Sequence, residues 1–251
     1  MNFIKDKIEN QVTRGLFITS GTEFAVELAA HAGFDYLILD MEHGLGDEGD
    51  VLRMIRSLNG FETAPIVRIP YLRIEYIKKV LDFGAAGIMC PMVETAADAQ
   101  NLVDFMRYPP AGKRGLTGSS HASGYGADFK DYFARANANL LCVAQIENAN
   151  GVENVDAIAA VEGVDVLFIG HSDLSLNLGC LNNFDDKKII EAELAVLAAA
   201  RKHGKIAGMM LKSGMNAQNC IDRGFTSLVL GTDIGCLRSA YSKLLNETAP
   251  E

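Results

Sequence analysis

Charged side chains follow several short apolar segments of the chain, at positions where a packed core has no use for them. His43, Arg68, Glu147 and Asp173 each lie at or just after the end of such a segment. A charged group there costs desolvation free energy unless it is paired, so packing alone rarely explains it. Two carboxylates without a cysteine suit a hard divalent cation such as Mg²⁺, Mn²⁺ or Co²⁺. Glu147 and Asp173 are therefore predicted metal ligands.

These residue types also suggest a reaction. Two carboxylate ligands leave roughly four octahedral positions free, and a 2-oxo acid can fill two of them through its carboxylate and keto oxygens. The metal would then hold the negative charge of an enolate, with Arg68 stabilising the same oxygen. His43 is the natural proton-transfer group. The combination predicts metal-assisted enolate chemistry.

Plain structural explanations remain open for single members of this set. Arg68 could simply pair with Glu42, and Asp173 could cap the helical turn that follows it. A purely structural role is a weaker explanation when four charged groups lie at the ends of neighbouring apolar segments.

The elements that must position these residues alternate between strand and helix. Mostly apolar strands, as in parallel sheets, are expected at Gly15–Thr19, Tyr36–Leu39, Pro65–Ile69, Gly87–Met92, Leu140–Ile146, Val164–Ile169, Ile206–Leu211 and Ser227–Leu230. Helical patterns between them often end in glycine, as at Gly33, Gly84 and Gly204. This series predicts one α/β domain over residues 1–251, a (β/α)8 TIM barrel, with a doubly wound open sheet as the alternative. The carboxyl ends of barrel strands meet on one face, which would gather the charged side chains there.

The two ends and one insertion complete the expected fold. Met1–Gly15 is expected to form an N-terminal capping helix, and Ile234–Glu247 a final helix. Tyr108–Asn139 is dense in proline and glycine and is expected to be a long loop, a kind of segment that is usually functional. It precedes the fifth strand, so part of it is expected at the non-catalytic end of the barrel.

Composition excludes several classes of protein. The 251 residues carry a net charge of −9, which argues against a nucleic-acid partner. The N-terminal MNFIKDKIEN lacks the apolar core of a secretory signal, and no apolar run is long enough to span a membrane. The 5 cysteines show no CxxC spacing, which favours reduced thiols in a cytoplasmic protein over a disulfide framework or a zinc site.

Several segments of the chain resemble the metal-dependent (class II) pyruvate aldolases of the HpcH/HpaI group. The segments are FDYLILDMEHG, PIVRIP, VLDFGAAGIMCPMVETAADA, RYPPAGKRG, VAQIEN and GVDVLFIGHSDLS. They occur in order over nearly the whole chain, and the set is specific although each motif alone is weak. The resemblance implies a (β/α)8 barrel that is usually a homohexamer, a trimer of dimers, with the C-terminal helix exchanged between partner subunits.

The resemblance also implies roles for individual residues. Glu147 and Asp173 would bind the metal, while Gln145 and the backbone amides of Ser172 and Asp173 would hold the pyruvate carboxylate or nearby waters. Arg68 would stabilise the enolate.

His43 would act as the base, directly or through a metal-bound water. Asp82, in VLDFG, is similar to an aspartate that raises the basicity of this histidine. The spacing places Asp82 near the opposite barrel face of its own chain, and the resemblance implies that it reaches His43 from a neighbouring subunit. Asp40 is a second candidate partner of His43.

Four residues depart from the family pattern or point to another mechanism. His171 and Ser172 stand where members often carry proline and then asparagine or alanine, and His171 could donate near the site or only pack. His121 lies roughly where some members place an arginine for a distal carboxylate, which could favour a neutral or hydroxylated aldehyde. Lys212, just beyond Ile206–Leu211, could instead form a Schiff base with pyruvate.

The predicted function is the reversible cleavage of a 4-hydroxy-2-oxo acid to pyruvate and an aldehyde through a metal-bound pyruvate enolate. The acid would be of the 2-keto-3-deoxy sugar acid or 4-hydroxy-2-oxo-dioate type. An acyl-CoA lyase of the citramalyl- or malyl-CoA type is one alternative, although only Lys113-Arg114 could serve a CoA phosphate. A non-catalytic metabolite-binding barrel is another, although it would not need a base beside a metal. The predicted binding partners, a 2-oxo acid and an aldehyde, are both small molecules, and neither a nucleic acid nor a membrane is expected as a partner.

Overall fold

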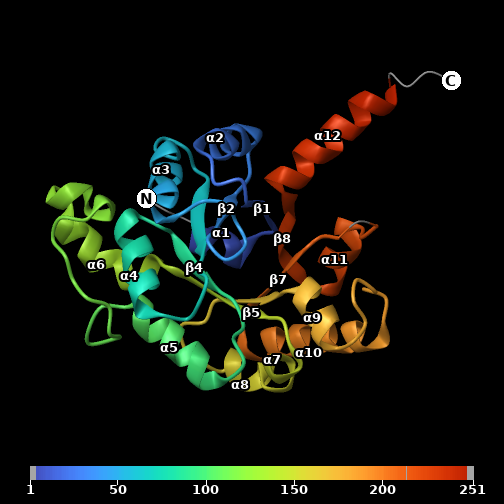
Figure 1. The fold of residues 1–251 in the computed structure, drawn as a ribbon. Helices are drawn as coiled ribbons and strands as arrows, with labels where there is room; N and C mark the ends of the chain where they lie inside the picture. Colours follow the sequence, from blue (N-terminus) through green and yellow to red (C-terminus); the bar gives the residue numbers. More distant parts are fainter. Residues whose placement is uncertain (1–3, 213, 248–251) are drawn as a thin grey trace.

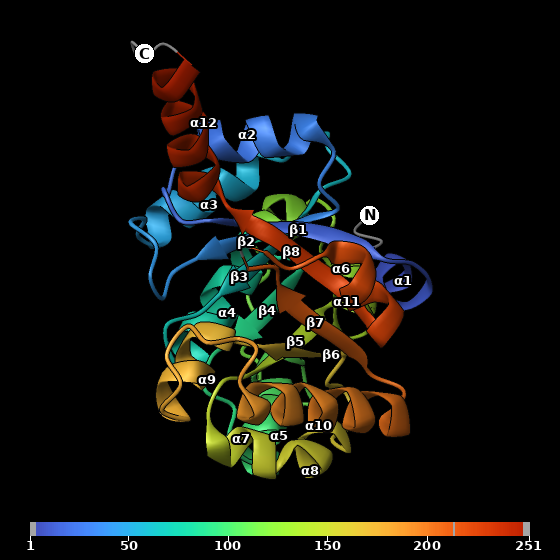
Figure 2. The same cartoon turned by 90° about the vertical axis from the view of Figure 1, so that its right-hand side faces the viewer.

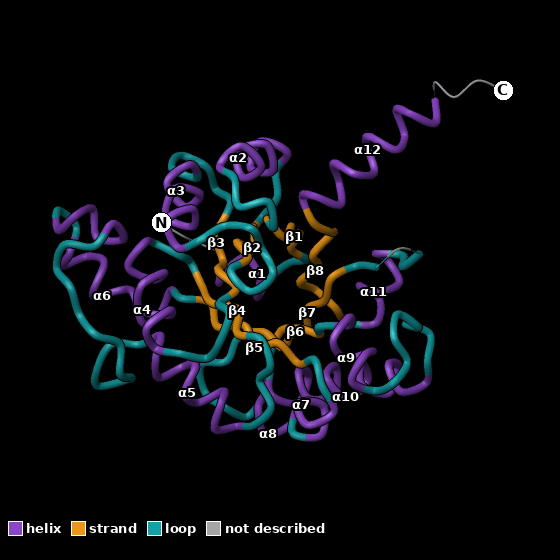
Figure 3. The backbone as a smooth tube through the Cα atoms, viewed as in Figure 1, coloured by secondary structure: helices purple, strands orange, loops and turns teal. Residues whose placement is uncertain are grey.

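The strands form a closed parallel barrel in a computed structural model that describes residues 4–212 and 214–247. In barrel order they are β1 (Thr13–Ile18), β2 (Tyr36–Asp40), β3 (Ala64–Arg68), β4 (Gly87–Cys90), β5 (Leu141–Ile146), β6 (Val166–Ile169), β7 (Ile206–Met210) and β8 (Phe225–Thr232). Figure 3 shows these strands as a central ring with the helices outside. The predicted (β/α)8 barrel is confirmed, and the open-sheet alternative is wrong.

Helices follow the strands around the ring. They are α2 (Glu23–Ala32), α3 (Glu48–Ser57), α4 (Ile74–Phe83), α5 (Ala96–Met106), α7 (Ala149–Glu153), α8 (Val155–Ala159), α9 (His171–Asn177), α10 (Lys187–His203), α11 (Ala217–Arg223) and α12 (Asp233–Glu247). Gly33, Gly84 and Gly204 end their helices with φ of 89°, 104° and 62°, a conformation that glycine adopts without steric cost. The predicted glycine stops are confirmed.

A short helix, α1 (Ile4–Asn10), closes the amino end of the barrel. Its Ile4 and Ile8 are buried among the inward-facing strand side chains, so the capping role is confirmed. The predicted range of Met1–Gly15 is wrong at its carboxyl end, because β1 already starts at Thr13. Gly15 pairs with strands on both sides, and a Cβ there would overlap the Tyr36 ring. Residues 1–3 lie outside the described residues.

The Tyr108–Asn139 insertion holds more structure than predicted. A 3₁₀ segment, η1 (His121–Gly126), and a helix, α6 (Phe129–Asn139), occupy its second half, so a loop throughout is wrong. The helix forms because Ala136 packs inward and Tyr132 bonds back to α4 through Leu81 O at 3.4 Å. η1 also contacts α4, at the end that faces the amino side of the barrel, as expected for part of this segment.

The chain ends in α12, which leaves the barrel after β8 and projects outward (Figures 1 and 2). The predicted final helix is confirmed, and of its residues only Asp233 is buried. Asp233 anchors the start of the helix by accepting the Thr19 backbone N–H at 2.9 Å. Among the described residues, no helix combines the length and the apolar character needed to cross a membrane.

Candidate active site

Asp40 and Arg68 face each other in the register of β2 and β3, at the carboxyl end of the barrel. Arg68 Nε donates to Asp40 Oδ1 at 2.9 Å, and Nη2 donates to Oδ2 at 2.7 Å. Burial alone would lower the pKa of Arg68, but Asp40 and the Glu42 charge raise it above its usual value. Arg68 Nη1 also lies 3.0 Å from Glu42 Oε2, so the pairing considered from the sequence exists beside the Asp40 pair.

The same Asp40 carboxylate holds the turn that carries His43. Asp40 Oδ1 accepts the backbone N–H of Glu42 at 3.0 Å and that of His43 at 3.3 Å. The imidazole itself is exposed, with 65% of the side chain accessible, and its Nε2 lies 3.9 Å from Glu42 Oε2. Asp40 therefore contacts His43 through its backbone, and the acid nearest to the imidazole is Glu42.

Glu147 is fixed in the barrel mouth by two neighbours. Its Oε1 accepts the Met92 backbone N–H at 2.7 Å, and its Oε2 accepts from Gln145 Nε2. Met92 follows Pro91 with a left-handed φ of 52°, and β4 stops at Cys90 rather than at the predicted Met92. Burial, together with the charges of Glu42 and Asp173, raises the pKa of Glu147 to about 7, although the Met92 hydrogen bond acts in the opposite direction.

Gly170 lets the ends of β5 and β6 approach each other. A Cβ at this position would overlap the Glu147 carboxylate and the Gln145 amide. Asp173 follows three residues later, and its charge contributes, after burial, to the raised pKa of both Glu147 and Glu42. Three carboxylates thus repel one another around this corner of the rim.

This donor set fits a hard divalent cation. Within residues 4–212 and 214–247 no group of three His, Cys, Asp or Glu side chains has the geometry of a complete metal site. Glu147 and Asp173 nevertheless supply carboxylate oxygens from adjacent strands, and Gln145 Oε1 is buried with no partner among the described residues. A cation there would relieve the repulsion and satisfy an orphaned acceptor, with oxygen ligands of the type that Mg²⁺ and Mn²⁺ prefer.

A pocket of about 240 Å³, here the rim pocket, collects most of the predicted side chains. Its lining consists of Phe17, Thr19, Asp40, His43, Arg68, Gln145, Phe168, Ile169, Gly170, His171, Ser172, Asp173, Met210, Lys212 and Thr232. Phe17 was not predicted; its ring lies beneath Arg68, 4.8 Å from the guanidinium carbon. Strand alternation could place Phe17 inside the barrel but not under Arg68. Met92 was also missed, since its role depends on a backbone conformation that no residue type announces.

Asp82 lies away from this rim within its own chain. It sits at the end of α4, where its Oδ1 accepts from Arg114 Nη2 at 2.7 Å. Arg114 is itself buried and stacks 4.4 Å over the Tyr108 ring. The expectation that Asp82 is remote from His43 in one chain agrees with this placement.

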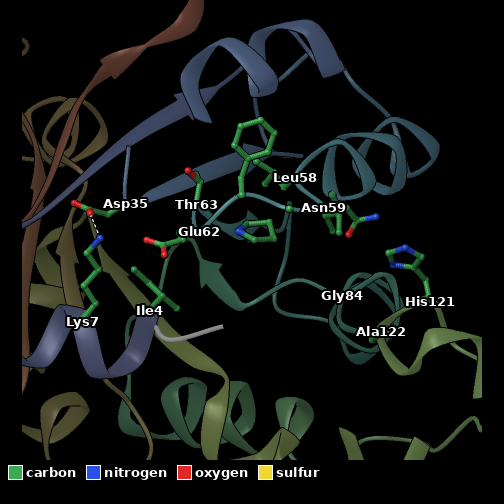
Figure 4. A pocket seen from close by; sticks show the side chains of 14 residues that line it. Ile4, Lys7, Asp35, Leu58, Asn59, Glu62, Thr63, Gly84, His121 and Ala122 are labelled. Carbon is green, nitrogen blue, oxygen red and sulfur yellow. Dashed lines mark ion pairs between the residues drawn. The ribbon is translucent and has the colours of Figure 1, made fainter. Parts of the chain in front are cut away.

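A larger hollow of about 730 Å³ opens at the amino side of β2 and β3 (Figure 4). The Lys7–Asp35 ion pair lies on one side of it and His121 on the other. His121 Nδ1 is 2.7 Å from Phe83 O, so this histidine does not reach the rim pocket of its own chain. None of the predicted site residues lines the hollow.

His171 and Lys212 both line the rim pocket. His171 is buried, and its Nε2 lies 2.7 Å from Glu193 Oε1, so this ring nitrogen is paired with a carboxylate that does not line the pocket. Lys212 Nζ donates to Ser172 Oγ at 2.9 Å. Burial lowers the pKa of Lys212, against the opposing charge of Asp173.

Known proteins resemble the chain over almost its full length. The sequence model of the family described as HpcH/HpaI aldolase/citrate lyase matches residues 13–240. A 5-keto-4-deoxy-D-glucarate aldolase of Klebsiella pneumoniae subsp. pneumoniae is 38% identical over 235 residues, covering 94% of this chain and 91% of the relative.

Solved structures show the same similarity over nearly the whole chain. A HpcH/HpaI aldolase/citrate lyase family protein from Burkholderia cenocepacia J2315 superposes with a TM-score of 0.94 and 33% identity, over 98% of this chain and 99% of that one. The citrate synthase SbnG superposes with a TM-score of 0.88 and 27% identity, over 97% and 96%. The range matched by the family includes every strand around the rim pocket.

Proposed function

The chain belongs to the HpcH/HpaI aldolase/citrate lyase family, and from this membership we propose a reaction and a role for each residue of the rim pocket. It is an aldolase, a carbon–carbon lyase. We propose that it reversibly cleaves a 4-hydroxy-2-oxo acid to pyruvate and an aldehyde. One observation carries this proposal: a buried Asp40–Arg68 pair and the exposed His43 share one pocket with Gln145 and Asp173.

The relatives guide the choice of substrate. Those at 38% identity are named 5-keto-4-deoxy-D-glucarate aldolases, which supports a substrate of the 2-keto-3-deoxy sugar acid type. They favour an aldolase over an acyl-CoA lyase, and a non-catalytic barrel has no use for the His43 and Arg68 arrangement. The citrate synthase at 27% identity is more distant.

We assign the divalent cation to Glu147 and Asp173, with Mg²⁺, Mn²⁺ or Co²⁺ as the candidates. Glu147 directly follows β5, Asp173 lies in the first turn of α9 after the adjacent β6, and Glu147 is almost fully buried. When bound, the cation would act as a Lewis acid on the carboxylate and C2 oxygens of the 2-oxo acid. Gln145, with the backbone amides of Ser172 and Asp173, would orient the carboxylate end of the substrate.

The chain's own groups carry the bond cleavage. His43 accepts the proton of the C4 hydroxyl, the C3–C4 bond breaks, and C4 leaves as an aldehyde carbon. The C3–C4 bonding electrons form a C2=C3 double bond, and the π electrons of the C2 carbonyl pass to its oxygen, which becomes an enolate oxygen facing Arg68. Asp40 occupies one hydrogen of Nε and one of Nη2, and Glu42 Oε2 makes no aligned hydrogen bond among the described residues. Nη1 lies in ion-pair contact with Glu42 without an aligned hydrogen bond, so its N–H groups would be available to donate to the enolate oxygen. A proton then returns to C3 and gives pyruvate.

Five further proposals concern the whole chain, its location and its assembly. We propose that residues 1–251 form one domain and that the enzyme is a cytoplasmic homohexamer, a trimer of dimers. α12 would be exchanged between subunits; its outward projection supports such a partner (Figure 2). Asp82 of a neighbouring subunit would then raise the basicity of His43.

A pyruvate-release screen tests the proposed reaction. Purified enzyme with Mn²⁺ is incubated with a panel of 4-hydroxy-2-oxo acids that includes 5-keto-4-deoxy-D-glucarate, and pyruvate is followed with a coupled dehydrogenase. We expect pyruvate and one equivalent of aldehyde from at least one sugar-acid member. Absence of pyruvate across the whole panel would refute the proposal.

A further inference from the structure

Lys212 is a cation of the rim pocket that forms no ion pair with any residue that the structure describes. It lies two residues beyond β7, is partly buried, and lines the pocket with Ser172. Of its three N–H groups, one donates to Ser172 Oγ at 2.9 Å. Its Nζ also lies 5.6 Å from the Phe184 ring centroid, a cation–π contact that restricts the side chain. Within the described residues, no carboxylate oxygen lies within ion-pair distance of its Nζ.

The other cation of the rim pocket differs in this respect. Arg68 is already balanced by Asp40 at 2.7 Å and by Glu42 at 3.0 Å. A half-buried charge without a partner costs free energy in the empty protein. An anionic group of the substrate that enters the pocket would offset this free-energy cost by pairing with Lys212, whereas Arg68 already has two carboxylate partners.

The barrel order places the two cations on opposite sides. In a closed ring of β1 to β8, β3 and β7 face each other, so Arg68 and Lys212 approach the pocket from opposite walls. Glu147 and Asp173, after β5 and β6, lie between them on the ring. If the C2 oxygen faces Arg68 and the amides of Ser172 and Asp173 hold the carboxylate as proposed above, the C1 carboxylate lies at the corner between β6 and β7.

We propose that Lys212, held by the Ser172 hydroxyl, binds the C1 carboxylate of the 2-oxo acid as a side-chain anchor in addition to the backbone amides. This inference rests on the proposed function, and it assigns Lys212 to substrate binding rather than to covalent chemistry. The group recognised is the carboxylate common to pyruvate and every 4-hydroxy-2-oxo acid, so the distal end of the substrate is not its ligand.

Calorimetric binding tests the anchor without turnover. Pyruvate and its neutral amide, pyruvamide, are titrated into Mn²⁺-loaded wild type, Lys212→Met and Lys212→Arg, with Lys187→Met as a surface control. Lys187 is exposed on α10 and pairs only with Glu191. We expect Lys212→Met to raise the pyruvate Kd about tenfold or more, the size expected for a lost hydrogen bond to a charged group. Pyruvamide should bind both proteins alike, and Lys212→Arg and Lys187→Met should retain pyruvate binding.

The Ser172 hydroxyl gives an internal check. Ser172→Ala should raise the pyruvate Kd by less than Lys212→Met, and the double variant should match Lys212→Met, because the hydroxyl acts through the ammonium group. A pyruvate Kd unchanged in Lys212→Met, or no pyruvate binding by the wild type, would overturn the anchor.

Two further outcomes would also overturn the anchor role of Lys212. The first is measured in the condensation direction, and the second is a trapping experiment. In the first, Lys212→Met raises the KM of glyoxylate, a carboxylate-bearing aldehyde, while the KM of pyruvate stays constant. In the second, borohydride traps pyruvate on Lys212, which shows a Schiff base. The proposed function fails by a different result, when pyruvate binds normally but no 4-hydroxy-2-oxo acid releases it.

Discussion

Asp40 and Arg68 form a buried ion pair with two hydrogen bonds, 2.9 Å from Nε to Oδ1 and 2.7 Å from Nη2 to Oδ2. The same carboxylate accepts the backbone N–H of His43 at 3.3 Å. One buried acid thus sets the position of both the guanidinium and the turn that carries the imidazole. Its contacts are those of a positioning residue, and a direct catalytic role beside the imidazole stays a prediction.

Replacing Arg68 with lysine should lower kcat about a hundredfold or more. A lysine cannot make the two-point contact with Asp40, and its ammonium would not stay directed at the developing oxygen charge. Steady-state pyruvate release measures kcat, with Arg56→Lys on the exposed side of α3 as control. A variant that retains near-normal turnover would remove Arg68 from the reaction.

Asp40→Asn should destabilise the fold as well as slow the reaction. The change leaves the Arg68 charge buried with only Glu42 as partner, and breaking a buried ion pair costs about 3 kcal/mol or more of unfolding free energy. Urea unfolding measures this loss. Glu191→Gln, which removes an exposed carboxylate paired with Lys187, should leave the unfolding midpoint nearly unchanged. Equal midpoints for wild type and Asp40→Asn would contradict the anchoring role.

Gly170→Ala should abolish activity with little effect on secondary structure. Its φ of −90° suits any residue, so the reason is space alone: the added methyl group would displace the Glu147 carboxylate and the Gln145 amide. Mn²⁺ titration should show weaker binding. Gly115→Ala is a matched control because nothing lies within 4 Å of its added Cβ. Normal Mn²⁺ affinity in Gly170→Ala would show that this close approach has no importance.

The stability of the metal-free enzyme should fall as the pH rises through 7. Burial raises the pKa of Glu147 from its usual 4.5 to about 7, so the folded state favours the protonated form. The protonated Glu147 contributes its full stabilisation to the folded state below pH 4.5. This contribution, about 3 kcal/mol in total, is lost once the pH is above 7. Unfolding free energies from pH 5 to 8 in the presence of a chelator measure it.

Glu147→Gln serves as the comparison for this pH dependence. The amide does not titrate, so the slope between pH 5 and 8 should be smaller in the variant, and the two proteins should differ most at pH 8. Mn²⁺ should stabilise the wild type at pH 8 and the variant less. Identical slopes in both proteins would contradict the raised pKa of Glu147.

The sequence predicted the barrel well because its signals are local and repeated. Apolar strands and helices ending at Gly33, Gly84 and Gly204 recur along the whole chain. The errors occur where local pattern and tertiary context disagree. Thr13 and Gly15 join β1 because neighbouring strands pair with them, and α6 forms in a segment whose proline and glycine content lies mainly upstream of it.

The rim was predictable by residue type, but its internal pairing was not. Strand ends identified Arg68 and Glu147, whereas the choice of Asp40 as the partner of Arg68 depends on the β2–β3 register. The Met92 N–H reaches Glu147 through a left-handed backbone, and Phe17 lies under Arg68 because β1, β2 and β3 curve around the barrel interior. Both relationships depend on distances in space that sequence spacing does not encode.

Pyruvate release measured before and after removal of divalent cations tests the proposed chemistry most directly. The enzyme, with a substrate cleaved in the panel screen, is assayed as purified, after exhaustive chelation, and after addition of Mg²⁺, Mn²⁺ or Co²⁺. Activity should disappear on chelation and return with at least one of these cations, and Glu147→Gln should need a higher cation concentration. Full activity in the chelated enzyme, with pyruvate trapped on Lys212 by borohydride, would contradict a cation held by Glu147 and Asp173.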